Sequence, residues 1–210
     1  MGFTYAACYQ LSKFVADSFF DLRVYGQEHI IEQGPALLAM NHQSFLDPPF
    51  AGISCQREIH YFGRKTLFDI PVIGAILRRI NVIGVDLEGS DVSALKAVIR
   101  VLRNGGCTVV FPEGTRTRDG HLQAAKPGAG FIIAKTLAPV VPMRIFGAFD
   151  AYPRGAKIPR MTPVTIVVGE PIHFGKADIT GDPRIVFQRL SERVMEKIAA
   201  LENPRAVCIP

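Results

Sequence analysis

The sequence ALLAMNHQSFLDPP, residues 36–49, joins an apolar run to a polar loop and sets the fold expected of the chain. Ala36–Met40 has the composition of a buried strand, which ends where the polar residues begin. Two prolines follow Asp47 directly and restrict the backbone there. Loops that follow strands present side chains from fixed positions. We therefore expect His42 and Asp47 to be held together at the end of a strand.

Apolar strand patterns alternate with helical patterns along the rest of the chain. Further strands are expected at Glu58–Phe62, Asn81–Val85, Cys107–Phe111, Val140–Phe146 and Val164–Val168. Helices are expected at Leu67–Ile80, from an N-cap at Ser90 to Gly105, at Gly128–Leu137 and from about Pro183 to Leu201. This alternation predicts an α/β fold, a single layered domain with a central mixed sheet flanked by helices.

An amphipathic helix is expected at the amino terminus, over residues 3–20. Its apolar side chains recur at helical spacing, namely Phe3, Ala7, Leu11, Phe14, Val15 and Phe19. The chain is thus divided into a helical segment, 1–22, and a domain, 23–210. This helix either packs on the domain or meets a membrane surface, and both can hold together.

Composition limits the classes of function. The 210 residues are 48% hydrophobic and 20% charged, which suits one folded domain with a substantial core. The net charge of +5 favours anionic partners, but no run of five basic residues occurs, so nucleic acid is not expected as a partner. No apolar stretch reaches membrane-spanning length, and no secretory leader is recognised. Four scattered cysteines favour a reducing, cytoplasmic compartment and predict no zinc site.

His42 and Asp47 have the chemistry of a base and its partner. Histidine titrates near neutral pH and can accept a proton from a hydroxyl group. A neighbouring carboxylate can fix the tautomer of the ring and stabilise the imidazolium. The alternative is an ordinary turn in which Asp47 caps the next helix. Ser44 lacks the elbow motif of a nucleophilic serine and is interpreted as structural.

A second motif, FPEGTR at Phe111–Arg116, follows another apolar strand. Gly114 would let a ligand approach the backbone, and Thr115 adds a hydroxyl group. Arg116 can hold a phosphate through two parallel hydrogen bonds, and Glu113 could orient an acceptor. The alternative is a plain strand-to-loop turn with a surface arginine and glutamate.

The two motifs, in this order, resemble the N-H-x-x-x-x-D and F-P-E-G-T-R signatures of the glycerophospholipid acyltransferase family. Lys126-Pro127-Gly128 is similar to its K-x-G stretch, and Val140–Met143, with Pro142, to its apolar V-P-V block. A proline inside such a run predicts an edge strand or a bulge, and a core role is as plausible as a pocket role. The resemblance covers about Val24 to Phe174.

The resemblance implies an acyltransferase domain that moves a fatty acyl group from acyl-CoA or acyl carrier protein to a lysophospholipid hydroxyl. The acceptor it favours is 1-acylglycerol-3-phosphate, which would give phosphatidate. His42 would be the base, Asp47 its partner and Arg116 a phosphate ligand. No metal or bound cofactor is implied. The protein would be cytoplasmic and peripheral on the inner face of the membrane.

One departure leaves the acceptor open. The family often carries an arginine in a pattern like F-I-D-R, where this chain has Leu87 after Asp86. Arg64 and Lys65 follow a predicted strand and could take over phosphate binding. Another lysolipid acceptor, or a lipid-binding protein without catalysis, remain the alternatives. Donor type, chain-length preference and oligomeric state are not predicted.

Overall fold

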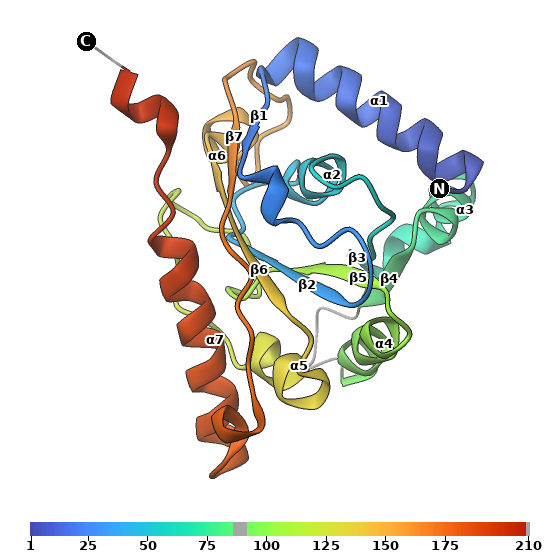
Figure 1. Cartoon of the computed structure of the whole chain (residues 1–210). Coiled ribbons are helices and arrows are strands. Elements are labelled where there is room, and N and C mark those ends of the chain that lie inside the picture. Colours follow the sequence, from blue (N-terminus) through green and yellow to red (C-terminus); the bar gives the residue numbers. More distant parts are fainter. Residues whose placement is uncertain (86–91, 209–210) are drawn as a thin grey trace.

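The computed structural model describes residues 1–85 and 92–208. A five-stranded mixed sheet forms its centre, in the order β1-β7-β6-β2-β5 (Figure 1). The strands are β1 (Arg23–Tyr25), β2 (Ala36–Met40), β5 (Cys107–Val110), β6 (Val140–Phe146) and β7 (Thr165–Val168). β2 lies between β5 and β6 and is parallel to both, whereas β7 is antiparallel to β6. The predicted α/β fold with a central mixed sheet is confirmed.

Helices cover both faces of the sheet (Figure 1). One face carries α4 (Val92–Arg103), α5 (Gly128–Thr136) and α7 (Pro183–Ala199). The other carries α1 (Phe3–Phe20), α2 (Asp47–Ile53) and α6 (Ala148–Ala151). β2 is buried on both sides because Leu37 and Ala39 face the first layer while Leu38 and Met40 face the second.

A small parallel pair, β3 (Tyr61–Arg64) and β4 (Val82–Val85), lies next to β5. A single bridge between His60 and Thr108 joins it to the main sheet. The strand predicted at Glu58–Phe62 therefore begins later than expected. Glu58 instead accepts hydrogen bonds from the Gly2 backbone and from Asn81, which holds it in the preceding loop.

The α-helix predicted at Leu67–Ile80 is present only from Pro71 to Arg79. A 3₁₀ helix (Lys65–Asp69) is followed by α3 (Pro71–Arg79), with Ile70 extended between them at φ −80° and ψ 115°. Proline disfavours the helical conformation of the residue before it, so Pro71 begins a new helix rather than continuing one.

Of the two alternatives predicted for Pro142, an edge strand is wrong, because β6 is a central strand, and an irregular pairing of the bulge type is present. Pairing shifts beside it: Met143 faces Val168, but Val140 faces Ile172, so the partner segment contains one extra residue. Pro142 accepts a hydrogen bond from Gly169 on that same side. Its missing N–H therefore faces the irregular pairing, where the loss is tolerated.

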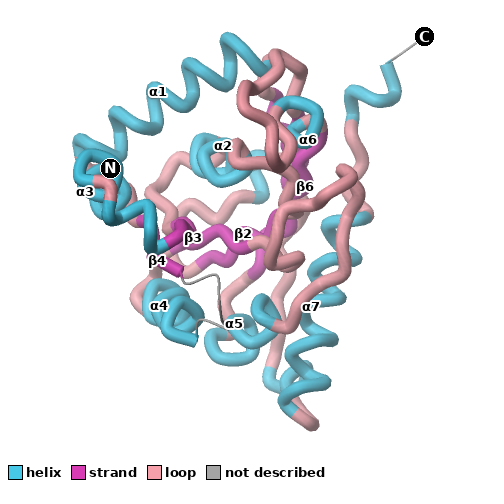
Figure 2. The backbone as a smooth tube through the Cα atoms, turned by 180° about the vertical axis from the view of Figure 1, so that it is seen from behind, coloured by secondary structure: helices cyan, strands magenta, loops and turns pink. Residues whose placement is uncertain are grey.

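The amino-terminal helix α1 is present, and it packs on the domain through one face. Tyr5, Ala16 and Phe20 are buried, and the Tyr5 hydroxyl group lies 2.9 Å from that of Tyr61. The apolar stripe identified in the sequence faces outward: Phe3 is 90% exposed and Phe14 is 65% exposed. Seen from behind, α1 crosses above α2 and its amino-terminal end lies beside α3 (Figure 2).

Short 3₁₀ helices complete the chain at Gln27–His29, Lys176–Ile179 and Pro204–Cys208. The last of these is joined to the end of α1, because Arg205 forms an ion pair with Asp21. The predicted N-cap Ser90 and the departure at Asp86 and Leu87 lie outside the described residues.

Candidate active site

The two sequence motifs meet because their strands are neighbours. β2 and β5 are parallel, with Ala39 opposite Val110, so the loops that follow them leave the same edge of the sheet. The backbone N–H of Thr117 donates to the carbonyl of His42 at 2.8 Å, which fastens one loop to the other. Residues that are about seventy positions apart in the sequence are thus in direct contact.

His42 and Asp47 form a hydrogen-bonded pair. Nδ1 of His42 lies 2.7 Å from Oδ2 of Asp47, which is fully buried. The same oxygen accepts from the backbone N–H groups of Gln43 at 2.6 Å and Ser44 at 2.7 Å. With Nδ1 donating to the carboxylate, Nε2 of His42 is the nitrogen left to accept a proton.

The helix-cap alternative for Asp47 does not describe this geometry. Asp47 is the first residue of α2, and no side chain caps that helix. Its carboxylate points back into the loop, toward groups that precede it in the chain. Burial raises the pKa of Asp47, and the hydrogen bonds from His42 and the loop oppose that shift.

The ring of His42 is held from a second side by Phe111. The two rings are stacked with centroids 3.9 Å apart, and the side chain of His42 remains 17% exposed. Phe111 is the first residue of the FPEGTR motif, so the motif supports the candidate base as well as supplying polar groups. The ring is positioned on two sides and still reachable by a substrate.

Glu113 is buried against the His42 loop, with an exposed fraction of 1%. Oε1 accepts from the backbone N–H of His42 at 3.2 Å, whereas Oε2 is buried without a hydrogen-bond partner among the described residues. Burial raises the pKa of Glu113 to about 7, despite that hydrogen bond and another from the Gln123 backbone. Glu113 thus supports the His42 loop and is positioned to change charge near neutral pH.

The turn after Glu113 is shaped by Gly114 and Lys126. Gly114 has φ +69°, and an added Cβ would lie 2.8 Å from Cδ of Lys126. The backbone N–H of Lys126 donates to Pro112 at 2.8 Å, so the K-x-G segment lies against the FPEGTR turn. Thr115 is exposed on the same turn.

Arg116 lies over the ring of Phe45, with Cζ 3.5 Å from the ring centroid. Its Nη1 is buried and has no hydrogen-bond partner among the described residues. Partial burial lowers the pKa of Arg116, and the positive charges of Arg154 and Arg64 lower it further. Arg64 is therefore close enough to act on Arg116, and Lys65 follows it at the start of the 3₁₀ helix.

Neutral polar residues of the first motif hold the site to its surroundings. Asn41 exchanges two hydrogen bonds with the backbone of Ile145 in β6. The Ser44 hydroxyl group donates to the carbonyl of Tyr152 at 2.8 Å and is fully buried, which agrees with a structural role. Sequence reasoning did not identify the partners of Asn41 and Ser44, because both partners lie more than a hundred residues away along the chain.

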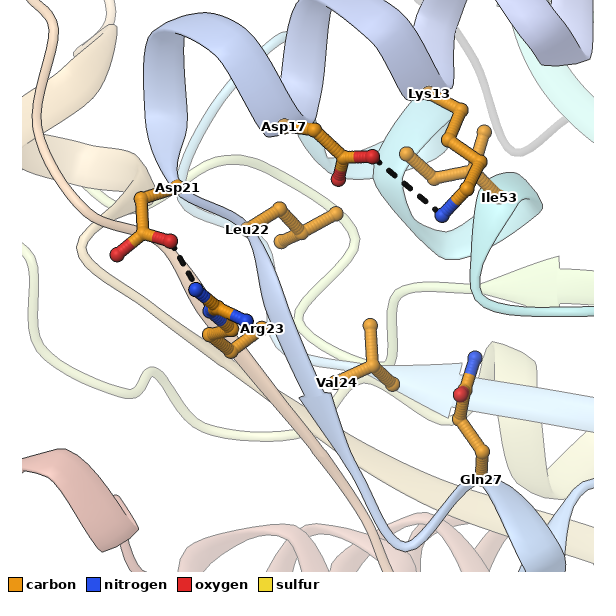
Figure 3. Close-up of a pocket in the computed structure, with 8 residues that line it drawn as sticks. All are labelled: Lys13, Asp17, Asp21, Leu22, Arg23, Val24, Gln27 and Ile53. Atoms are coloured by element: carbon orange, nitrogen blue, oxygen red, sulfur yellow. Dashed lines mark hydrogen bonds and ion pairs between the residues drawn. The ribbon is translucent and has the colours of Figure 1, made fainter.

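Not every residue proposed for the site joins this group. Pro142 is paired with Ala39 inside the sheet, and its ring lies close to Gly169, which suits a core position. A separate hollow of about 390 Å³ lies beneath α1 and shares no residue with the site (Figure 3). Two ion pairs line it, Lys13 with Asp17 and Arg23 with Asp21. Within residues 1–85 and 92–208, no cluster of three potential metal ligands is found.

Comparison with known proteins gives consistent results. The family model described as Acyltransferase matches residues 21–146, more than half of the chain. A chloroplastic 1-acyl-sn-glycerol-3-phosphate acyltransferase from Arabidopsis thaliana is 33% identical over 77% of this chain. The 1-acyl-sn-glycerol-3-phosphate acyltransferase of Bacillus subtilis is 28% identical over 95% of it. The crystal structure of the 1-acyl-sn-glycerophosphate acyltransferase PlsC from Thermotoga maritima superposes with a TM-score of 0.76 at 25% identity.

The extent of these matches differs. The chain spans about half the length of the chloroplast relatives, 46% for the Arabidopsis protein and 48% for its Brassica napus counterpart. It spans 97% of the Bacillus protein and 81% of the Thermotoga chain, while 95% of this chain is covered in both. With the motifs, the fold and the family match in agreement, this chain belongs to the Acyltransferase family.

Proposed function

We propose that this protein transfers a fatty acyl group from a thioester donor to the sn-2 hydroxyl of 1-acylglycerol-3-phosphate, forming phosphatidate. The observation that carries the proposal is the 2.7 Å pair of His42 and Asp47 beside the guanidinium group of Arg116. A base and an anion-binding cation lie on facing loops. The name of the Bacillus relative, which aligns over nearly its whole length, supports this choice of acceptor.

The chemistry follows from which nitrogen of His42 is available. Nε2 accepts the proton of the acceptor hydroxyl as its oxygen attacks the thioester carbonyl. The buried carboxylate of Asp47 stabilises the imidazolium that forms. Collapse of the tetrahedral intermediate breaks the carbon–sulfur bond, and the proton passes from His42 to the leaving thiolate. An activated donor makes an acyl-enzyme unnecessary, which fits Ser44 being buried and hydrogen-bonded to Tyr152.

The donor is proposed to be acyl-CoA or acyl carrier protein, because both present the same thioester. Lys126 and Lys65 are cations near the two loops and are candidates for binding the phosphates of either donor or acceptor. No bound cofactor takes part in the proposed reaction. Among the residues named for substrate binding, Gly114 contributes through its backbone, since its φ of +69° favours glycine.

The acceptor lipid implies a membrane surface, and the structure offers an apolar one. The outward stripe of α1 continues toward α3, where Val72 is 71% exposed and Ile73 and Ile76 also face outward. Arg78 and Arg79 end α3 and could contact anionic head groups. None of the helices in residues 1–85 and 92–208 is long and apolar enough to cross a bilayer. We propose peripheral attachment on the cytoplasmic face through α1 and α3.

The test is an assay of the purified full chain with mixed lysolipids in vesicles. Acyl-CoA and acyl carrier protein donors are supplied in separate reactions, and products are identified by mass spectrometry. We expect phosphatidate as the main product. Turnover of a different lysolipid, with none of lysophosphatidate, would reject this acceptor, and absence of any acyl transfer would reject the enzyme.

A further inference from the structure

The loop between α6 and β7, residues 152–164, brings an arginine to the site that neither motif contains. Its beginning is fastened to the His42 loop by the hydrogen bond from Ser44 to Tyr152. The ring of Tyr152 lies 6.1 Å from that of Phe45, the ring over which Arg116 is placed. Arg154 follows this anchored point by two residues, and its positive charge acts on Arg116.

The loop is closed on itself, which limits where Arg154 can lie. The backbone N–H of Arg160 donates to Ala151 at 2.7 Å, and that of Ala156 donates to Pro153 at 3.2 Å. Gly155 follows Arg154 with φ +91°, a conformation that favours glycine. Because the turn is tight and Tyr152 is anchored, the backbone of Arg154 has little freedom to move away from the His42 loop.

The positive charges of two further arginines act on the guanidinium group of Arg116. Arg154 is the first of the charges that lower the pKa of Arg116, after burial, and Arg64 is the next. Within the part of the chain that the structure describes, none of the three forms an ion pair with a carboxylate, and Nη1 of Arg116 is buried without a partner. Like charges held together raise the free energy of the site, and a bound anion would relieve that repulsion.

We propose that Arg154, which lies outside both motifs, joins Arg116 and Arg64 in binding the phosphomonoester of the acceptor and gives the site its preference for that group. The inference rests on the proposed acyl transfer to a lysophospholipid. A phosphomonoester has up to two negative charges and three terminal oxygens, which three guanidinium groups can share. Phe45 fixes the plane of Arg116, so Arg154 completes the site from the opposite loop.

The first test measures binding without turnover. Glycerol 3-phosphate, the soluble head group, is added to the full chain, and the melting temperature is followed. We expect a rise in the wild type, a much smaller rise in Arg154→Gln, and a wild-type rise in Arg160→Gln. Arg160 is the matched control because it is an exposed arginine in the same loop. Equal responses in the two variants, or no wild-type response, would overturn the assignment.

The second test measures specificity. Values of kcat/KM are compared for lysophosphatidate and for 1-acylglycerol, which lacks the phosphate. Arg154→Gln should lose roughly tenfold on lysophosphatidate alone, the usual loss for one charged hydrogen-bonding partner. An equal loss on both acceptors, or an Arg154→Gln activity on lysophosphatidate equal to that of Arg160→Gln, would overturn the proposal. If the wild type has no turnover but binds glycerol 3-phosphate through Arg154, the proposed function fails while the anion site stands.

Discussion

At the scale of single residues, His42 depends on a carboxylate that folding itself disfavours. Burial raises the pKa of Asp47, so its negative charge is maintained at a cost in stability. Such a cost is typical of a group retained for its chemistry. Removing the charge should therefore harm the reaction without harming the fold.

Asp47→Asn should lower turnover by about 10² to 10⁴, because the imidazolium of His42 loses its stabilising charge. Its melting temperature should equal or exceed that of the wild type. Asp150→Asn, on the exposed surface of α6, serves as the control for carboxylate loss. Steady-state kinetics and thermal melts check both parts. Wild-type turnover, or a large drop in melting temperature, would mean that Asp47 only holds the loop.

His42→Ala, which removes the base, should lose turnover in the same range.

Glu113 predicts a measurable dependence of stability on pH. The pKa of this buried side chain is raised from 4.5 to about 7, so folding binds a proton between these values. The contribution of Glu113 to stability is thus lost as pH rises from 4.5 to 7, by up to about 3 kcal/mol. Glu113→Gln cannot titrate. The free energy of unfolding of the variant, relative to that of the wild type, should therefore rise between pH 4.5 and 7, and the difference should be constant above pH 7.

Chemical denaturation at a series of pH values measures this difference. Glu196→Gln, on the exposed face of α7, is the control for loss of an acidic side chain. A gap between Glu113→Gln and wild type that is constant from pH 4.5 to 8 would contradict the proton linkage. Because wild type and variant share every other titrating group, the difference isolates Glu113.

At the scale of elements, α5 and α7 approach each other closely at one glycine. A Cβ added to Gly130 would lie 1.8 Å from the carbonyl oxygen of Phe187, which is backbone and cannot turn aside. The N–H of Gly130 also donates to Ser191 at 2.8 Å. This contact fixes the distance between the two helices that cover one face of the sheet.

Gly130→Ala should lower the free energy of unfolding by at least about 1–3 kcal/mol, which is the usual cost of overpacking. Alanine is the better helix former, so helix propensity alone would predict a gain. Gly128→Ala on the same helix is the matched control, since its nearest neighbour would be 4.0 Å away. Denaturant titration of both variants decides the matter. A stabilised Gly130→Ala would show that α5 and α7 can move apart freely.

At the scale of the whole molecule, the sequence was sufficient where local pattern and strand order decide the structure. Ala36–Met40 is apolar on both faces and Cys107–Val110 is apolar except for Thr108, so their burial and the loops that follow them could be predicted. The exchange between Asn41 and Ile145, and the approach of Arg154 to Arg116, depend on contacts between distant segments. No periodicity in the sequence encodes which loops become neighbours.

The departures from the sequence predictions have the same origin. Pro142 lies in a central strand rather than at an edge, and the one-residue shift in pairing with the segment after β7, which corresponds to the predicted bulge, is a property of two strands together. The helical periodicity over Leu67–Ile80 was real, but the restriction that proline places on Ile70 divided it. In α1 the apolar spacing identified a helix, whereas its inward face carries Tyr5 and Tyr9, which form hydrogen bonds with the domain.

The outward face of α1 provides the last prediction, on how the molecule meets a membrane. Phe3, Leu11 and Phe14 are each replaced by serine, and the affinity for anionic vesicles is measured by co-sedimentation. Each replacement should lower that affinity roughly tenfold or more, because burying one such side chain in the bilayer contributes about 1.5–3 kcal/mol. The melting temperature should not fall, because these side chains face outward. Higher salt should weaken the binding of wild type only in part, since screening affects the cationic contribution and leaves the apolar one.

Tyr5→Phe, on the inward face of the same helix, should behave in the opposite way. It leaves the buried N–H of Ile59 without its 3.0 Å partner, and unfolding should become easier by about 1–3 kcal/mol. Binding to vesicles should be retained below the melting temperature. If the serine variant sediments like wild type, or if Tyr5→Phe loses vesicle binding while still folded, the outward stripe is not the membrane contact. The contrast separates attachment to the bilayer from attachment to the domain, because one helix supplies both through different faces.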